Sequence, residues 1–215
     1  MNPNQEIWLI RHAEVALRWK GICYGSMDVS LSDAGKQASE RLAGSLVQWL
    51  KPRVVYHSGL SRTKYLANYI GILGCGHIEV REDKRLRERN YGIWEGLNWD
   101  AAYESDPDHF HDLIHKPNSY RPQEGETTSE MQQRMIAWLN EIEVGDRPII
   151  GISHSGPIAS LAGYLQGLHA TQWESCMTRN LEGICLGRNQ SVQGAWFVKC
   201  KRELSGSLND EKARE

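Results

Sequence analysis

The sequence of 215 residues contains no apolar stretch long enough to cross a membrane, and residues 1–6 lack the basic start of a secretory signal. We therefore expect a cytoplasmic protein without a membrane partner. The 25 Lys and Arg residues nearly balance the 27 Asp and Glu residues, and no basic face is concentrated in the sequence. This charge balance argues against nucleic acid as the main partner.

The five cysteines are widely spaced, odd in number, and include no Cys-x-x-Cys pair. This pattern indicates neither a disulfide framework nor a zinc site, so we expect reduced thiols. Cys23 lies in a glycine-bearing loop expected near the site, but reactivity would require a lowered pKa. The other cysteines are Cys75, Cys176, Cys185 and Cys200.

Three histidines lie close together in the sequence, at His109, His111 and His115. The last two have the i, i+4 spacing of one helical face and could bind a metal if Asp108 or Asp112 joined them. A polar helical face explains the spacing equally well, and the usual ligand patterns are absent. We therefore predict no metal site and no other cofactor.

The length and the 40% hydrophobic content suit one domain with a sizeable core. Apolar runs typical of buried strands, at 7–10, 53–57 and 148–153, alternate with segments of helical periodicity. We expect an α/β fold: a three-layer α/β/α sandwich with a mostly parallel central sheet. This domain is expected over 1–200, followed by a charged tail over 201–215.

Several elements have specific boundary signals. One helix is expected after a Ser32 cap, a second from Arg62 onward, and a third after a capping box at Ser129 and Gln132. Late strands are expected at 182–186 and 195–198, joined by a polar turn around 189–190.

The alternation of strands and helices fails between residues 98 and 128, where polar, aromatic and proline residues accumulate. This composition is typical of a small insertion, or lid, over an active site, and we expect it to govern substrate choice. Trp94 and Trp99 could flank a planar substrate. Buried packing is the commoner role of tryptophan and is favoured for both.

Two histidines follow apolar runs. His12 comes after Arg11 and the run 7–10, and His154 comes directly after the run 148–153. Because ligands bind at the carboxyl ends of strands in open α/β sheets, the two histidines could share one pocket. Each alone is most simply a solvated loop residue. The following Ser155 opens a predicted helix whose first N–H groups would face an anion.

Four segments resemble the histidine phosphatase superfamily in their order and spacing, and the similarity extends over roughly residues 6–200. The segments are 9–14 with Arg11 and His12, 60–62 with Arg62, 88–96 with Glu88, and 153–156 with His154.

The resemblance implies a metal-independent phosphatase that acts on a small phosphorylated metabolite. His12 would be the nucleophile and become phosphohistidine, and Glu88 would protonate the leaving group and then activate water. Arg11 and Arg62 would bind phosphate oxygens through their guanidinium groups. A protonated His154 would complete the set.

Cations beside Glu88 oppose its role as an acid, because Arg85, Arg87 and Arg89 favour the ionised carboxylate. In an extended segment, Arg87 and Arg89 would point away from Glu88, and a bound phosphate would raise the Glu88 pKa.

The segments 21–32 and 123–126 resemble those of α-ribazole phosphatases, which dephosphorylate a nucleotide-loop precursor in cobalamin synthesis. The resemblance therefore suggests α-ribazole 5'-phosphate as the substrate. Four further residues are expected to contact the substrate: Arg18, Tyr24, Gly25 and Ser155.

The sequence departs from the family pattern at three places. Ala13 replaces the glycine common after the nucleophile, and Arg18 stands where many relatives carry asparagine. The segment 58–67 lacks the proline and threonine typical around the second arginine.

Other functions remain open. A broad-specificity phosphatase of the superfamily shares the same four segments. The segment 88–92 resembles phosphoglycerate mutases except for Asn90. A mutase, however, also uses paired arginines in the insertion, and the insertion here offers only Lys116 and Arg121. A non-catalytic phosphate-binding or regulatory protein is the alternative of another class. A homodimer is also open, since no motif specifies an interface.

Overall fold

The computed structural model describes residues 6–143, 145–189 and 195–204. Its six described strands form one sheet in the order β3-β2-β4-β1-β5-β6. Strands β3, β2, β4 and β1 run parallel to one another, whereas β5 pairs antiparallel with β1 and β6. The predicted mostly parallel sheet is therefore confirmed. The strands are β1 (Glu6–Arg11), β2 (Val54–His57), β3 (Glu79–Glu82), β4 (Ile149–Ser153), β5 (Glu182–Asn189) and β6 (Ala195–Glu203).

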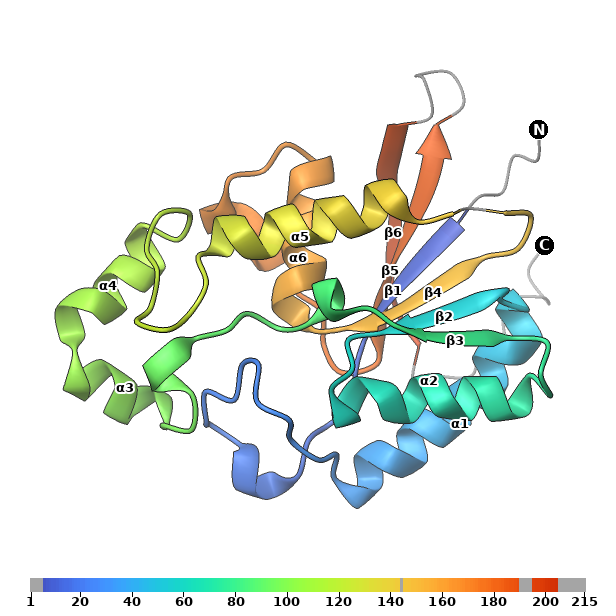
Figure 1. Ribbon diagram of the computed structural model, residues 1–215, viewed down its shortest axis with the longest axis horizontal. Coiled ribbons are helices and arrows are strands. Elements are labelled where there is room, and N and C mark those ends of the chain that lie inside the picture. Colours follow the sequence, from blue (N-terminus) through green and yellow to red (C-terminus); the bar gives the residue numbers. More distant parts are fainter. Residues whose placement is uncertain (1–5, 144, 190–194, 205–215) are drawn as a thin grey trace.

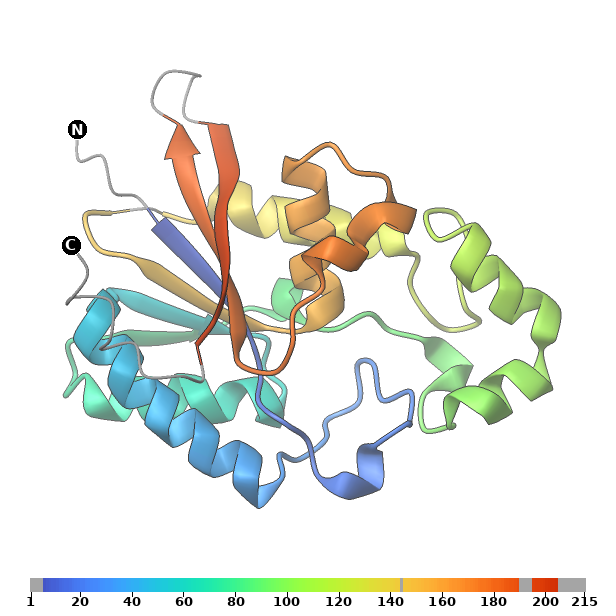
Figure 2. The ribbon, with the colours of Figure 1, turned by 180° about the vertical axis from the view of Figure 1, so that it is seen from behind.

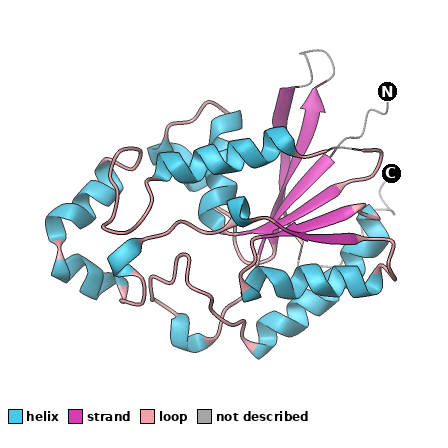
Figure 3. Cartoon of the chain, viewed as in Figure 1, coloured by secondary structure: helices cyan, strands magenta, loops and turns pink. Residues whose placement is uncertain are grey.

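Helices cover both faces of the sheet, as Figures 1 and 3 show. One face carries α1 (Asp33–Leu50) and α2 (Ser61–Leu73), and the other carries α5 (Thr128–Glu141) and α6 (Ser155–Leu165). The α/β/α sandwich predicted from the sequence is confirmed. Short 3-10 turns lie at η1 (Leu17–Trp19), η2 (Lys84–Leu86), η3 (Gly92–Trp94) and η4 (Ala170–Cys176).

Alternate residues of the central strands face opposite layers of the core. In β1, Ile7 and Leu9 pack in the cluster that includes Trp138 of α5, while Trp8 and Ile10 pack in the cluster that includes Leu46 of α1. Strands buried on both faces are expected to be continuously apolar, which explains why these segments were detectable as apolar runs.

The helix boundaries follow local capping. Ser32 caps α1 by accepting from the Gly35 N–H, as predicted. The capping box of α5 is formed by Thr127 and Glu130, so the prediction of Ser129 and Gln132 was wrong by two residues. The Thr127 hydroxyl accepts from the Glu130 N–H, and the Glu130 carboxylate accepts from the Thr127 N–H, which satisfies two otherwise unpaired donors.

The C-terminal strands are longer than predicted. Strand β6 runs to Glu203, and Leu204 is buried in the core cluster of α1 and α2, so the predicted tail does not begin at 201. The rest of that tail, and the predicted turn beyond Asn189, lie outside the described residues.

The insertion forms two short helices, α3 (Trp99–Ser105) and α4 (Pro107–His115), at one end of the molecule (Figures 1 and 2). It has its own small core, in which Trp94 is buried beside Tyr120 and Phe110. Buried packing is confirmed for Trp94, whereas Trp99 is only partly buried. No described helix is long and apolar enough to span a membrane.

Candidate active site

The two histidines singled out in the sequence lie side by side. Parallel pairing of β1 and β4 places Arg11 opposite Ser153, and the His12 N–H donates to the Ser153 carbonyl at 3.1 Å. The next residues along each strand are therefore neighbours, and the ring centroids of His12 and His154 are 5.1 Å apart. Both rings are buried. The carboxyl edge of the sheet thus brings together two side chains that are far apart in the sequence.

A hydrogen bond fixes the tautomer of His12. Its Nδ1 lies 2.6 Å from the Ala13 carbonyl oxygen. A carbonyl can only accept, so Nδ1 carries the proton. Burial, and then the positive charge of Arg62, hold the His12 pKa well below its usual value. The ring is therefore neutral near neutral pH, and its Nε2 keeps the lone pair that a nucleophile needs.

His154 also has a defined tautomer. The Arg62 Nε–H donates to its Nδ1 at 3.2 Å, so this nitrogen carries no proton. The Nε2–H then donates to the Ser58 hydroxyl at 2.9 Å. Burial and the charge of Arg62 keep the His154 pKa well below its usual value. The expectation of a protonated His154 is therefore wrong for the unliganded protein, because a protonated Nδ1 could not accept from Arg62.

Arg62 is fully buried near the start of α2, and three of its N–H groups have protein partners. Besides His154, it donates to the carbonyls of Met27 and Gly25, each at 2.6 Å. The guanidinium also lies 5.1 Å from the ring centroid of Tyr24. The loop predicted to contact substrate through Tyr24 and Gly25 therefore holds Arg62 in place, and the Gly25 carbonyl is occupied.

Glu88 is partly buried, and loss of solvent raises the pKa of its carboxyl despite the opposing effects of the Arg89 N–H and the charge of Arg62. Its Oε1 lies against the first turn of α6, where a Cβ added to Gly156 would approach to 2.5 Å. Gly156 therefore leaves the space that Glu88 occupies. A carboxyl with a raised pKa can hold the proton that a general acid must supply.

The three arginines near Glu88 in the sequence do not pair with its carboxylate. Arg85, Arg87 and Arg89 direct their guanidinium groups to partners other than the Glu88 carboxylate, which removes the difficulty raised by the sequence. Their partners are the Asp83 and Glu141 carboxylates, the Ser58 carbonyl, and the Glu126 and Tyr120 carbonyls.

The loop after η4 forms hydrogen bonds with Arg11, His12 and Ser155. The Thr178 carbonyl accepts from Arg11 Nη1 at 2.7 Å and from the Ser155 hydroxyl at 3.1 Å. The Asn180 amide donates to the His12 carbonyl at 3.0 Å. The Ser155 hydroxyl is thus used within the protein, but its backbone N–H lies at the open N-terminus of α6. Arg11 Nε is buried and has no hydrogen-bond partner within the described structure.

Sequence reasoning missed Glu95, which secures the loop that holds Arg62. Its carboxylate accepts from the Ser26 N–H at 2.7 Å, the Ser26 hydroxyl at 3.0 Å and the Tyr91 N–H at 3.1 Å. A side chain at Gly25 would collide with this carboxylate, so glycine is required there. Sequence reasoning also missed Ser58, Thr178 and Asn180. Ser58 follows a buried strand, which was an available signal, but the other two had none.

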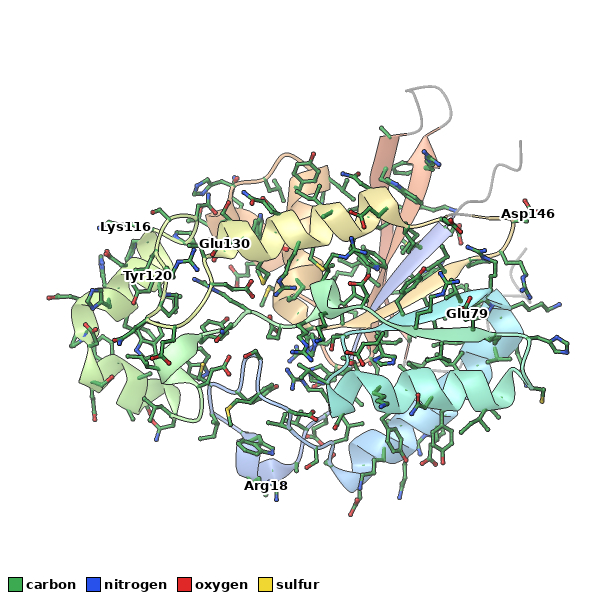
Figure 4. The ribbon with its side chains drawn as sticks, viewed as in Figure 1. Arg18, Glu79, Lys116, Tyr120, Glu130 and Asp146 are labelled. Carbon is green, nitrogen blue, oxygen red and sulfur yellow. The ribbon has the colours of Figure 1, made fainter. Side chains whose placement is uncertain are left out.

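Arg18 makes its hydrogen bond outside the group formed by His12, Arg62, Glu88 and His154. It lies on the exposed turn η1, at the outer edge of the molecule in Figure 4, and donates to the Ser30 hydroxyl. Its guanidinium lies 5.4 Å from the ring centroid of Trp19. A neighbouring cavity of about 380 Å³ is lined by Arg11, Tyr24 and Trp99, but not by Arg18.

The described residues contain no group of three or more His, Cys, Asp or Glu side chains placed to hold a metal. Asp106 caps α4 by accepting from the His109 N–H and also contacts the His109 ring, and the His111 and His115 rings lie 3.9 Å apart on the same helix. Burial raises the pKa of the Cys23 thiol to about 12, so this cysteine stays protonated and unreactive at neutral pH.

The sequence profile of the histidine phosphatase superfamily, branch 1, matches residues 7–193. Phosphoglycerate mutase-like protein 4 from Arabidopsis thaliana is 32% identical over 160 residues, covering 73% of this chain and 69% of that protein. Phosphoserine phosphatase 1 from Hydrogenobacter thermophilus is 27% identical over 169 residues, covering 78% of this chain and 79% of that protein.

Solved structures show the same fold. A mycobacterial glucosyl-3-phosphoglycerate phosphatase with inorganic phosphate has a TM-score of 0.78 at 24% identity, covering 95% of this chain and 100% of that chain. An Escherichia coli protein with a suggested alpha-ribazole-5'-P phosphatase activity has a TM-score of 0.78 at 23% identity, covering 94% and 97%. Since the profile spans most of the sequence, this chain belongs to branch 1 of the histidine phosphatase superfamily.

Proposed function

We propose that this protein hydrolyses phosphate monoesters of a small metabolite, without a metal, through a phosphohistidine at His12. One observation carries the proposal. The hydrogen bond from His12 Nδ1 to the Ala13 carbonyl leaves Nε2 unprotonated in a neutral ring, within a site that also holds the buried Arg62, the partly buried Arg11 and a protonatable carboxyl. This combination is what a covalent phosphoryl transfer through histidine requires.

In the first half-reaction, His12 Nε2 attacks the phosphorus, and the bond from phosphorus to the ester oxygen breaks. Glu88 gives its proton to the departing oxygen, so the product leaves as a neutral alcohol. The raised pKa of Glu88 keeps that proton available before the substrate arrives. The reaction leaves phosphohistidine and an ionised Glu88.

In the second half-reaction, Glu88 takes a proton from water as the water oxygen attacks phosphorus. The bond from phosphorus to His12 Nε2 breaks, phosphate is released, and Glu88 regains its proton. One carboxyl therefore acts first as an acid and then as a base, and no net proton is lost from the site.

The equatorial phosphate oxygens need fixed positive charge during both steps. Arg62 uses three N–H groups on His154, Met27 and Gly25, which leaves two of its five for a ligand. Arg11 contributes a second guanidinium, whose Nε has no partner among the described residues. His154 orients Arg62 in the unliganded protein, and the negative charge of a bound phosphate would raise the His154 pKa.

The candidate substrate is α-ribazole 5'-phosphate. Its support is the resemblance of segments 21–32 and 123–126 to α-ribazole phosphatases, together with aromatic side chains beside Arg11. A mutase is disfavoured, because Lys116 pairs with Asp112 and Arg121 pairs with Glu130, so the insertion presents no paired arginines for a carboxylate. Figure 4 shows Lys116 and Glu130 at the insertion end of the molecule.

The test measures phosphate release from α-ribazole 5'-phosphate, 3-phosphoglycerate, nucleoside monophosphates and an aryl phosphate, with a chelator present. The expected result is the highest kcat/KM for α-ribazole 5'-phosphate and no activity in His12→Ala. Similar low values for all the esters would favour a broad-specificity phosphatase. Phosphate binding without turnover of any ester would favour the non-catalytic alternative.

We also propose that the protein works in the cytoplasm without nucleic acid. A homodimer remains a prediction. Light scattering on the purified protein measures its mass directly and would overturn the dimer if the monomer mass persists at high protein concentration.

A further inference from the structure

The cavity of about 380 Å³ beside the catalytic group is not explained by phosphate binding alone. Arg11, which precedes His12, and Asn180, which donates to the His12 carbonyl, are among its lining residues. The cavity extends from there between the loop that carries Trp19 and the start of α3, where Trp99 lies. Its volume falls within the range of roughly 300–1,000 Å³ typical of small-molecule sites.

Each aromatic side chain that lines this cavity has a further contact with another ring or with a guanidinium group. Trp99 packs edge-on against Tyr91 at 5.4 Å and Phe110 at 6.2 Å between ring centroids. Trp19 is covered by the Arg18 guanidinium. The third wall, Tyr24, stacks against Arg62, as described above. Rings held in this way present fixed faces to a ligand, which lowers the entropy lost on binding.

Backbone hydrogen bonds also fix the position of the loop around residues 19–24 relative to the insertion. The Trp99 N–H donates to the Gly21 carbonyl at 3.2 Å, and the Cys23 N–H donates to the Leu97 carbonyl at 2.8 Å. Ile22 pairs with Asn98 in an isolated bridge between them. The two walls therefore belong to segments joined by backbone pairing, and the spacing between Trp19 and Trp99 does not depend on side chains alone.

The charged side chains that line the cavity do not suit a small leaving alcohol that carries a carboxylate. Glu14 is committed to Ser32, whose hydroxyl donates to it at 3.0 Å. Lys20 is exposed, and Arg11 is the single guanidinium among the lining residues. Because Arg11 is assigned to the phosphate, no further guanidinium of the cavity lining is left to bind a substrate carboxylate with paired hydrogen bonds. Apolar side chains, including Val15, Leu17 and Ile22, line the cavity as well.

We propose that this cavity is the leaving-group subsite and that it selects phosphate esters whose alcohol carries a flat, apolar ring system and no carboxylate. This inference rests on the proposed phosphatase activity and assigns its specificity to Trp19 and Trp99. The ring lies between the two tryptophans while the phosphate reaches Arg11 and His12. Offset or edge-on contacts with a ring contribute about 0.5–1.5 kcal/mol per aromatic pair beyond the area that they bury.

The experiment compares 2-(1-naphthyl)ethyl phosphate with ethyl phosphate. Both are esters of primary alcohols, so the leaving groups have similar basicity and the comparison isolates binding of the ring. We expect the wild-type kcat/KM to favour the naphthyl ester at least about tenfold. In Trp99→Ala and in Trp19→Ala this ratio should fall about tenfold. Trp196→Ala is the matched control, since Trp196 lines a separate cavity between α5 and β6 and should leave the ratio unchanged.

Inhibition by inorganic phosphate shows whether the phosphate-binding site of each variant is still intact. If Trp99→Ala abolishes phosphate inhibition, the substitution has disrupted the phosphate site itself. The ratio measured for Trp19→Ala then tests the proposed ring contact, because Trp19 lies outside the packed core of the insertion. If wild type hydrolyses ethyl phosphate in a His12-dependent manner but shows no preference for the ring, this inference is wrong and the proposed function stands. A preference for 3-phosphoglycerate that disappears in Lys20→Ala would also overturn it. If no ester is hydrolysed, the proposed function itself fails.

Discussion

The Arg62 Nε–H donates to Nδ1 of His154, and this contact at 3.2 Å sets the direction of every hydrogen bond beyond it. The Nε2–H of His154 donates to Ser58 at 2.9 Å, and Ser58 in turn donates to Thr63 at 2.8 Å. The chain ends where the Thr63 hydroxyl donates to the Leu60 carbonyl at 2.8 Å. Arg62 is therefore oriented by a chain of partners with fixed donors, and the site is arranged before a ligand binds.

Replacement of Arg62 by lysine tests this arrangement. An ammonium group cannot reproduce the planar set of donors that reaches His154, Met27 and Gly25 together. Each buried acceptor left without a partner costs roughly 1–3 kcal/mol in the free energy of unfolding. We expect Arg62→Lys to lose at least about a hundredfold in kcat/KM, by analogy with the loss of one donor to a developing negative charge.

Steady-state kinetics and urea unfolding measure both effects. Arg81→Lys is the control, because Arg81 pairs with Glu79 on the exposed strand β3. An Arg62→Lys enzyme with normal kcat/KM would show that the planar set of guanidinium donors is unnecessary for activity.

Gly156→Ala should disable Glu88 without touching its carboxyl chemically. The added Cβ would lie 2.5 Å from Glu88 Oε1, so either the carboxylate or the helix must move. A misplaced acid should lower kcat about a hundredfold for alkyl esters, within the range of general acid catalysis. Gly44→Ala in α1 is the matched control, since no atom lies within 4 Å of its new Cβ.

The Gly44→Ala enzyme should keep its activity and gain roughly 0.5–1 kcal/mol in the free energy of unfolding, because alanine favours helix. Equal activity of the Gly156→Ala enzyme and wild type would contradict the placement of Glu88 against α6.

Glu95→Gln should weaken the site through the loop that carries Gly25. Glutamine has one acceptor oxygen, whereas the Glu95 carboxylate accepts from the Ser26 N–H, the Ser26 hydroxyl and the Tyr91 N–H. We expect phosphate to inhibit the variant about tenfold less strongly, since Arg62 loses the support of the Gly25 carbonyl. Glu104→Gln on the exposed side of α3 should leave phosphate inhibition unchanged. A purely structural role for Glu95 would lower the melting temperature and leave the phosphate inhibition constant as in wild type.

The pH dependence of kcat/KM should be bell-shaped. Burial lowers the pKa of His12, so protonation removes the nucleophile only when the pH falls below that lowered value. Burial raises the pKa of Glu88, so ionisation removes the acid when the pH rises through that raised value. In Glu88→Gln, the loss of activity on the alkaline side should disappear along with most of the rate. An alkaline limb that survives this substitution would assign the acid to another group.

Strand-end reasoning predicted the neighbourhood of His12 and His154 because both follow continuous apolar runs, a pattern that burial on both faces enforces. Strand β3 escaped detection, since its residues are charged and mostly exposed at the edge of the sheet. The protonation state of His154 also could not be predicted, because it depends on a donor from α2, 92 residues away in sequence.

The residues that support the candidate catalytic residues were harder to predict than His12 and His154 themselves. Thr178 contacts Arg11 through its backbone carbonyl, which any residue possesses, so its side chain gives no signal. The two tryptophans at the insertion show the same limit: Trp94 is buried and Trp99 lines a cavity, although both stand in similar sequence surroundings. Tertiary packing, not local composition, separates their roles.

Trapping the covalent intermediate tests the central claim most directly. The enzyme is mixed with an aryl phosphate, denatured within milliseconds in alkali, in which phosphohistidine survives, and digested for mass spectrometry. The account predicts one phosphoryl group on His12 in wild type and none in His12→Ala. Rapid turnover by wild type with no phosphoryl group on His12, or with the group on another residue, would contradict it.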